Sequence, residues 1–182
     1  VGHRLEGDRQ DGDNEGKTFK GQVGKLVLPA FLSIHDDPSQ RALAGEPLNG
    51  YYLYDEEGVK GQRVTLVEKG VLRNYLLGRR PVEGFLQSNG HGRSQGTLKP
   101  VARMANLMVD STRQVSDEKL KQMLIDEAKK QGKPYGLIIR DITGGTTNTS
   151  SYGYQAFKGV PRMVYRVDVK TGKETLVRGV EI

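Results

Sequence analysis

The sequence predicts an α+β fold dominated by antiparallel strands, arranged as mainly antiparallel sheet or as a partly open barrel, with one main helix and long irregular loops. Short runs of Val, Leu, Ile and Tyr recur along the chain between glycines, which is typical of strands joined by turns. Glycine is abundant, at 24 of 182 residues, and it tolerates the positive φ angles of tight turns. Only one segment combines helical periodicity with a capping residue.

Two hairpins are the clearest strand signals. The first joins a strand at 62–67 to a strand at 71–77, and Gly70 supplies the positive φ of the turn. The second joins 161–169 to 174–178 through Lys-Thr-Gly-Lys. In both, β-branched and aromatic residues flank a glycine-containing turn, as in hairpins generally.

Three further segments have less regular patterns. Residues 26–34 predict a strand that Pro29 interrupts or places at an edge, and that ends at the turn residues His35 to Pro38. Residues 39–50 are rich in Gly and Pro and predict a loop. The apolar run at 135–142 predicts a buried strand, and the polar run at 144–151 predicts a loop.

The predicted helix begins after Ser116, a good N-cap, and ends at Gly132 before Pro134. Asp117 and Glu118 suit the positive end of the helix dipole. An apolar stripe indicates that one face of the helix packs on the sheet, and it comprises Leu120, Met123, Leu124 and Ala128.

Composition excludes several classes of protein. Lys and Arg exceed Asp and Glu by 28 − 22 = 6, and mean hydropathy is −0.59. This mild positive charge could favour acidic partners, but no dense basic helix or aromatic RNA-reading motif accompanies it, so nucleic-acid binding is not expected. The sequence contains no signal peptide, no membrane span and no cysteine. We therefore expect a cytoplasmic protein that does not bind membranes.

Few side chains could perform chemistry. Of the three histidines, His3 lies at the start of the chain and His91 lies in a glycine-rich loop at 88–96. A lone histidine near a terminus is usually solvated, because a zinc site needs three protein ligands. The glycine loop lacks a phosphate-binding pattern. Beyond it, Arg103 and Asn106 could either fix a bound peptide backbone or satisfy the carbonyls of a neighbouring loop.

Two motifs favour a functional role for His3 over that of a solvated histidine. Residues 2–8 are Gly-His-Arg-Leu-Glu-Gly-Asp, and residues 19–24 are Phe-Lys-Gly-Gln-Val-Gly. Both resemble the TldD/PmbA family of zinc metallopeptidases, once described as modulators of DNA gyrase. The Asp-Glu-Gly, strand, Glu-x-Gly, strand order around the first hairpin, Gly92-Arg93, and the Arg-Met-x-Asn run at 103–106 match the same family.

The resemblance implies that His3 is the second histidine of an HExxxH zinc motif. The first histidine and the general-base glutamate would lie before Val1, and the family's cysteine ligand has no counterpart here. Glu6 and Asp8 would orient His3, or would cap and solvate the helix end. Residues 1–182 would form a single domain, a fragment of the family's C-terminal domain, with the N-terminal domain and the final strands absent.

The implied activity is hydrolysis of unfolded or extended peptides. Zn²⁺ would serve the full-length protein, whereas this fragment alone would hold no metal and be inactive. Partners would be a peptide or protein substrate and a family member in a homo- or hetero-oligomer. The alternatives are a noncatalytic peptide-binding or partner subunit of the same family, or a protein that modulates DNA gyrase.

Overall fold

The computed structural model describes residues 2–10, 18–147 and 157–180, and the side chain of His3 lies outside that description. The chain divides into two compact units. Of the described residues, 2–10 and 18–112 belong to the first unit, and 113–147 and 157–180 belong to the second. Each unit is described by itself.

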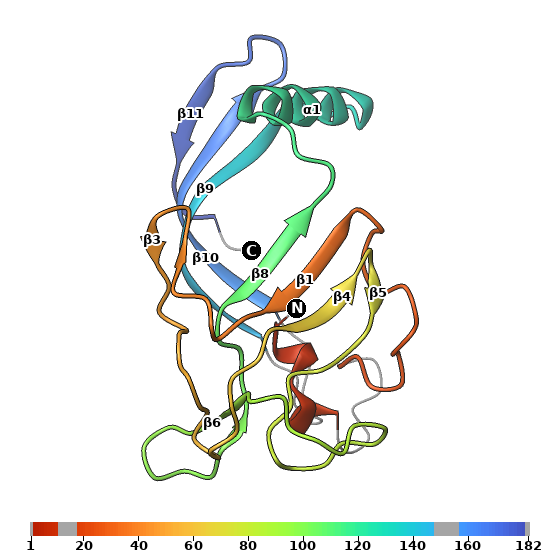
Figure 1. Cartoon of the computed structure of the whole chain (residues 1–182). Helices are drawn as coiled ribbons and strands as arrows, with labels where there is room; N and C mark the ends of the chain where they lie inside the picture. The colour runs from red at the N-terminus through yellow and green to blue at the C-terminus, as the bar shows by residue number, and fades with distance from the viewer. Residues whose placement is uncertain (1, 11–17, 148–156, 181–182) are drawn as a thin grey trace. The chain divides into compact units, whose positions relative to one another are not determined.

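The first unit is built on a four-stranded antiparallel sheet with the order β5-β4-β1-β8 (Figure 1). The unit also contains pairs of strands that are each two residues long, and short 3₁₀ helices. The elements are η1 (Gly2–Leu5), η2 (Gly7–Arg9), β1 (Leu32–Asp36), β2 (Ala42–Leu43), β3 (Glu46–Pro47), β4 (Val64–Glu68), β5 (Val71–Leu72), β6 (Gly92–Arg93), β7 (Val101–Ala102) and β8 (Leu107–Ser111).

The predicted first hairpin is confirmed as β4 and β5. Lys69 and Gly70 both have positive φ, 47° and 80°, which matches the right-handed twist of the paired strands. The second strand is shorter than predicted, because the backbone N–H groups of Arg73 and Asn74 both donate to Leu66 O and end the regular ladder. Apolar side chains of this hairpin enter the core of the first unit, whose largest fully buried members include Leu5, Leu66, Leu72 and Leu76.

The strand predicted at 26–34 is misplaced. Val27 N and Leu28 N donate to Gly70 O, at 2.8 and 3.1 Å, so this part of the chain wraps around the hairpin turn. Pro29 has no N–H to donate, and the regular strand β1 begins only at Leu32. It then continues through His35 and Asp36, which the sequence had suggested as a turn. Strand β8 and the small hairpin β2–β3 were not predicted.

The second unit contains the predicted helix and the second hairpin. Helix α1 (Asp117–Lys130) begins as expected, with Ser116 Oγ accepting from Lys119 N at 3.3 Å. The hairpin belongs to a three-stranded antiparallel sheet ordered β11-β10-β9 (Figure 1), in which the strands are β9 (Tyr135–Thr147), β10 (Phe157–Asp168) and β11 (Glu174–Val177).

Helix α1 packs on this sheet, as predicted, through Ile125 and Ala128, which contact Val167, Val169 and Ile138. The predicted apolar stripe is wrong for Leu120 and Met123, which are 57% and 48% exposed in this unit, because the buried face is centred on Ile125. The prediction that 135–142 is a buried strand is wrong within this unit, because alternate side chains point away from the helix and stay exposed. The loop predicted from 144 is also wrong as far as Thr147, since Gly144 and Gly145 pair with β10, and the remainder of that loop lies outside the described residues.

The architecture is therefore α+β with mainly antiparallel sheets, as predicted, and the sheets do not close into a barrel. In the described part of the chain, no helix has the length and apolar content needed to cross a membrane.

Candidate functional site

The segment that carries His3 is held in the core of the first unit. Its two 3₁₀ helices run beside Leu76: Leu76 N donates to Leu5 O at 2.8 Å, and Gly7 N donates to Leu76 O at 2.7 Å. Leu5 and Glu6 are completely buried. These bonds fix the backbone on the C-terminal side of His3, whose own side chain lies outside the described residues.

Glu6 and Asp8 bind the chain at 102–103. The buried Glu6 carboxylate accepts a hydrogen bond from Arg103 Nη1 at 2.7 Å and from Arg9 Nε at 3.3 Å. The Asp8 carboxylate accepts from Ala102 N. Both side chains therefore hold the N-terminal segment to a strand almost 100 residues away, and their predicted action on His3 stays a prediction.

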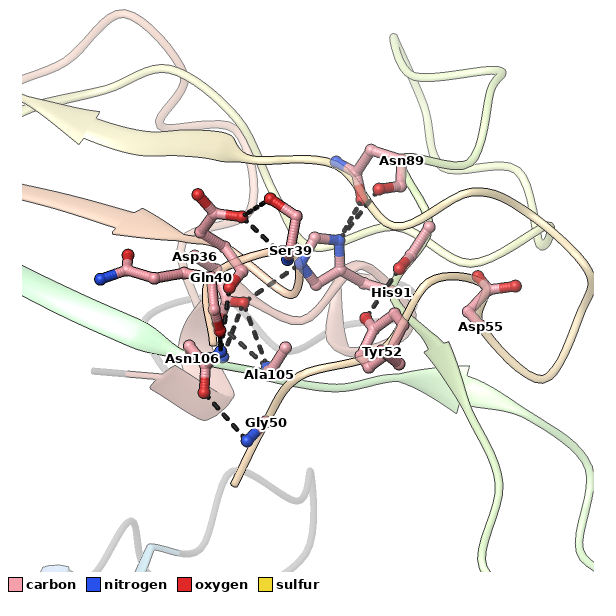
Figure 2. Close-up of polar contacts among 12 residues, drawn as sticks. Asp36, Ser39, Gln40, Gly50, Tyr52, Asp55, Asn89, His91, Ala105 and Asn106 are labelled. Atoms are coloured by element: carbon pink, nitrogen blue, oxygen red, sulfur yellow. Dashed lines mark hydrogen bonds and ion pairs between the residues drawn. The ribbon is translucent and has the colours of Figure 1, made fainter. Parts of the chain in front are cut away.

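The Asn106 side chain holds neighbouring loop segments together, and we call this set of contacts the Asn106 clamp. Its amide nitrogen donates to Asp37 O at 3.0 Å and Gln40 O at 2.9 Å, and its Oδ1 accepts from Gly50 N at 2.9 Å (Figure 2). This geometry matches the second of the two predicted roles, in which it satisfies neighbouring carbonyls. Arg103 is different, since 39% of its side chain remains exposed beside its ion pair with Glu6.

We expect Gly50→Ala to destabilise this clamp, because the added Cβ would overlap the carbonyl group of Ala105. Overpacking at a rigid backbone contact costs about 1 to 3 kcal/mol. Gly144→Ala is the control, as no heavy atom lies within 4 Å of its added Cβ, and its effect should stay within about 0.5 kcal/mol. Urea denaturation of both variants checks the difference; equal free energies of unfolding would refute the clamp.

A buried contact between an aspartate and a histidine lies next to this clamp. Asp36 at the end of β1 and His91 before β6 are both completely buried, and His91 Nε2 lies 3.2 Å from Asp36 Oδ1 (Figure 2). The Asp36 carboxylate also accepts from Ala105 N and Asn106 N, each at 3.1 Å. On the other side of the ring, Nδ1 lies 3.1 Å from Asn89 O and 3.0 Å from Asn89 Oδ1.

Both nitrogens of the His91 ring therefore face acceptors. Asn89 Oδ1 accepts from Leu77 N while its amide nitrogen donates to Tyr75 O, which fixes the orientation of the Asn89 amide. These contacts hold the imidazole from both sides. His91, which the sequence placed in a glycine-rich loop with no matched ligand role, is thus buried and held between Asp36 and Asn89 in the first unit.

Local sequence patterns did not predict the contact between Asp36 and His91. Asp36 and Asp37 were read together as turn formers, and this holds for Asp37, whose Oδ1 accepts from Ser39 N at 2.9 Å. Asp36 instead points inward. The one local signal was the pair of glycines beside His91, because Gly90 has φ 77° and its backbone closely approaches Lys60 O.

Tyr52 anchors the loop that contains Gly90 and His91. Its hydroxyl donates to Gly90 O at 2.7 Å, and the Arg93 guanidinium lies 4.3 Å from its ring centroid. Burial raises the pKa of Tyr52 above its ordinary value, so the hydroxyl remains a donor. Arg93 also pairs with Glu56, and this hydrogen bond lowers the pKa of the Glu56 carboxyl.

The described residues do not form a metal centre on their own. No three His, Asp or Glu side chains among them lie close enough together to hold a metal ion. The carboxylates nearest to His3 in sequence are already engaged, Glu6 by two arginines and Asp8 by a backbone N–H. The described side chains therefore do not make up a complete zinc site, and any such site needs ligands beyond them.

Comparison with known proteins identifies the family. Residues 1–174 match the PmbA/TldA metallopeptidase C-terminal domain. This chain belongs to that family. The TldD/PmbA resemblance seen in the motifs is thereby confirmed.

Relatives of the chain carry metalloprotease names. A metalloprotease of Archaeoglobus fulgidus is 29% identical over 100% of this chain and 41% of its own length. A zinc metalloprotease TldD homolog of Saccharolobus solfataricus is 26% identical over 97% of this chain and 35% of its own length. The chain thus spans about two fifths or less of these relatives.

The fold also matches a solved family structure. TldE from Thermococcus kodakarensis superposes with a TM-score of 0.62 at 15% identity, covering 97% of this chain and 36% of that protein. At this identity the likeness establishes the fold alone.

Proposed function

We propose that the complete protein carrying this chain is a zinc-dependent peptidase that hydrolyses unfolded or extended peptides, and that this chain alone is inactive. The observation that supports the proposal most is the family match at residues 1–174, which includes the His3 motif. The zinc metalloprotease name of the Saccharolobus relative supports the choice of metal.

In this proposal His3 would be one ligand of the zinc ion, which would supply a Lewis acid when bound. The residues of this chain would position that ligand. Glu6 and Asp8 bind Ala102 and Arg103, while Leu5 and Gly7 pair with Leu76, so the backbone after His3 has little freedom to move. The exposed part of the Arg103 guanidinium would be a donor for a substrate carbonyl.

We further propose that residues 1–182 are part of one larger domain, and that the complete protein assembles with a second copy or with another family member. Both proposals draw on the relatives, which extend well beyond the matched region and include proteins named TldD homolog and TldE.

Metal removal tests the proposed activity. A chelator should abolish hydrolysis of a flexible peptide by the complete protein, and added Zn²⁺ should restore it, because the metal would be needed for catalysis and not for the core of the first unit. The same peptide sequence inside a stably folded domain should resist cleavage. Undiminished hydrolysis by protein shown to be free of metal would refute the proposal.

A further inference from the structure

A pocket of about 470 Å³ opens in the first unit beside the segment that carries His3. Its apolar walls come from Val23, Tyr75, Val82 and Phe85. Pockets of this size that combine apolar walls with a few polar groups commonly bind small ligands or parts of larger ones. Its walls come from the N-terminal segment and from 75–85, so it is not part of the Asp36 and His91 cluster.

The apolar walls are held rigidly. The Tyr75 ring meets the Phe85 ring edge-on, with centroids 5.3 Å apart, and the Tyr75 hydroxyl donates to Phe19 O at 2.8 Å. Two backbone hydrogen bonds of 3.1 and 2.7 Å join Val82 and Phe85 across a tight turn. A ligand therefore meets a preformed surface, which lowers the entropic cost of binding.

The pocket adjoins the proposed metal ligand through Gln10. Gln10 lines the pocket and is only 3% exposed, and its amide nitrogen donates to Arg4 O at 3.0 Å and Glu6 O at 2.7 Å. These carbonyls lie one and three residues after His3. Because both bonds fix the amide orientation, Gln10 Oε1 is left as a buried acceptor without a hydrogen-bond partner in the described structure. Such acceptors are uncommon in native proteins, so this one marks the side of the pocket that lies next to the His3 segment.

The charged residues of the pocket lie at its exposed rim. Lys20 and Glu83 both line the opening and are exposed, and they carry opposite charges. A charged substrate side chain would lose water against the aromatic wall, and the two opposite charges at the rim would offer it no net attraction. A neutral apolar side chain loses nothing comparable.

We propose that this pocket receives an aromatic or large aliphatic side chain of the peptide substrate, close to the bond that is cleaved. The inference rests on the proposed peptidase function and adds a preference to it. The pocket would select peptides by apolar burial, while the remaining substrate backbone would bind without regard to sequence.

The test uses the complete zinc-loaded protein and flexible peptides of equal length and charge. One position at a time carries Phe, Leu, Gly or Glu, and cleavage is mapped by mass spectrometry. Val23→Trp fills the mouth of the pocket from a residue that is 42% exposed. Val115→Trp is the matched control, at a valine that is 49% exposed in the second unit and is not among the residues that line the pocket.

We expect wild-type kcat/KM to be higher by about ten-fold or more for Phe or Leu than for Gly at one position near the cleaved bond. Val23→Trp should lose that preference while keeping its zinc, and Val115→Trp should keep the preference. No preference in the wild type, or an unchanged preference in Val23→Trp, would overturn the assignment alone. Loss of zinc from Val23→Trp would also overturn the assignment. It would indicate that another part of the complete protein occupies the pocket, so that the pocket is not open to a substrate. No cleavage of any peptide would overturn the proposed function and this assignment together.

Discussion

Replacing Asp36 by alanine is expected to lower the free energy of unfolding by about 2 to 4 kcal/mol, because it leaves the buried His91 ring and the N–H groups of Ala105 and Asn106 without their partner. Asp36 and His91 are both completely inaccessible to solvent. The bond from Asn106 N is buried as well, so water would not readily replace the lost carboxylate there. The loss should extend to the Asn106 clamp, since Asp36 fixes its backbone.

The chain contains a matched control for this prediction. His35 Nδ1 lies 3.0 Å from Asp110 Oδ2, so this is also an Asp and His pair, but 64% of the Asp110 side chain is exposed. Asp110→Ala should cost less than about 1 kcal/mol, because water replaces the lost partner. Urea denaturation of the two variants measures both values. Equal costs would contradict the view that burial, not pairing alone, makes Asp36 important.

Local sequence signals predicted the elements that form from a few neighbouring residues. The turn at Lys69 and Gly70 and the cap at Ser116 are both where the sequence placed them, since each depends on φ angles or hydrogen bonds within four residues. The second hairpin, β10 with β11, follows the same rule. Its turn is closed by Gly172, whose φ is 68°.

Elements that depend on distant partners were predicted poorly. Strand β1 extends through Asp36 because β4 and β8 pair with it on both sides, and β8 lies more than 70 residues away along the chain. Strand β8 itself has a mixed polar and apolar sequence that gives no clear alternation. The burial of 135–142 was overestimated because an apolar run cannot show how many faces of a strand are covered.

The same difference between local and distant partners applies to the residues of the candidate site. Resemblance to a family located His3, Glu6 and Asp8 in the sequence, but it gave no information on what their side chains touch. The bond between Glu6 and Arg103 joins residues 97 positions apart, so no local pattern contains it. The burial of His91 was not predicted, because a glycine-rich loop is usually at the surface, whereas here two glycines let the backbone pass close to its neighbours.

In the complete protein, we expect His3→Ala to abolish zinc retention and peptide hydrolysis together while the fold persists. Loss of a metal ligand removes the ion and its Lewis acidity at once. The fold should persist because the core of the first unit comes from Leu5, Leu66, Leu72, Leu76 and their neighbours. His35→Gln is the suitable histidine control, since His91 is needed for the buried contact with Asp36.

Zinc content of the purified His3→Ala protein, measured per chain beside its cleavage of a flexible peptide, tests the central claim most directly. The account predicts about one zinc per chain and turnover in the wild type and in His35→Gln, and neither zinc nor turnover in His3→Ala, with unchanged circular dichroism in all three. A folded His3→Ala protein that keeps one zinc per chain and wild-type turnover would contradict the assignment of His3 as a metal ligand.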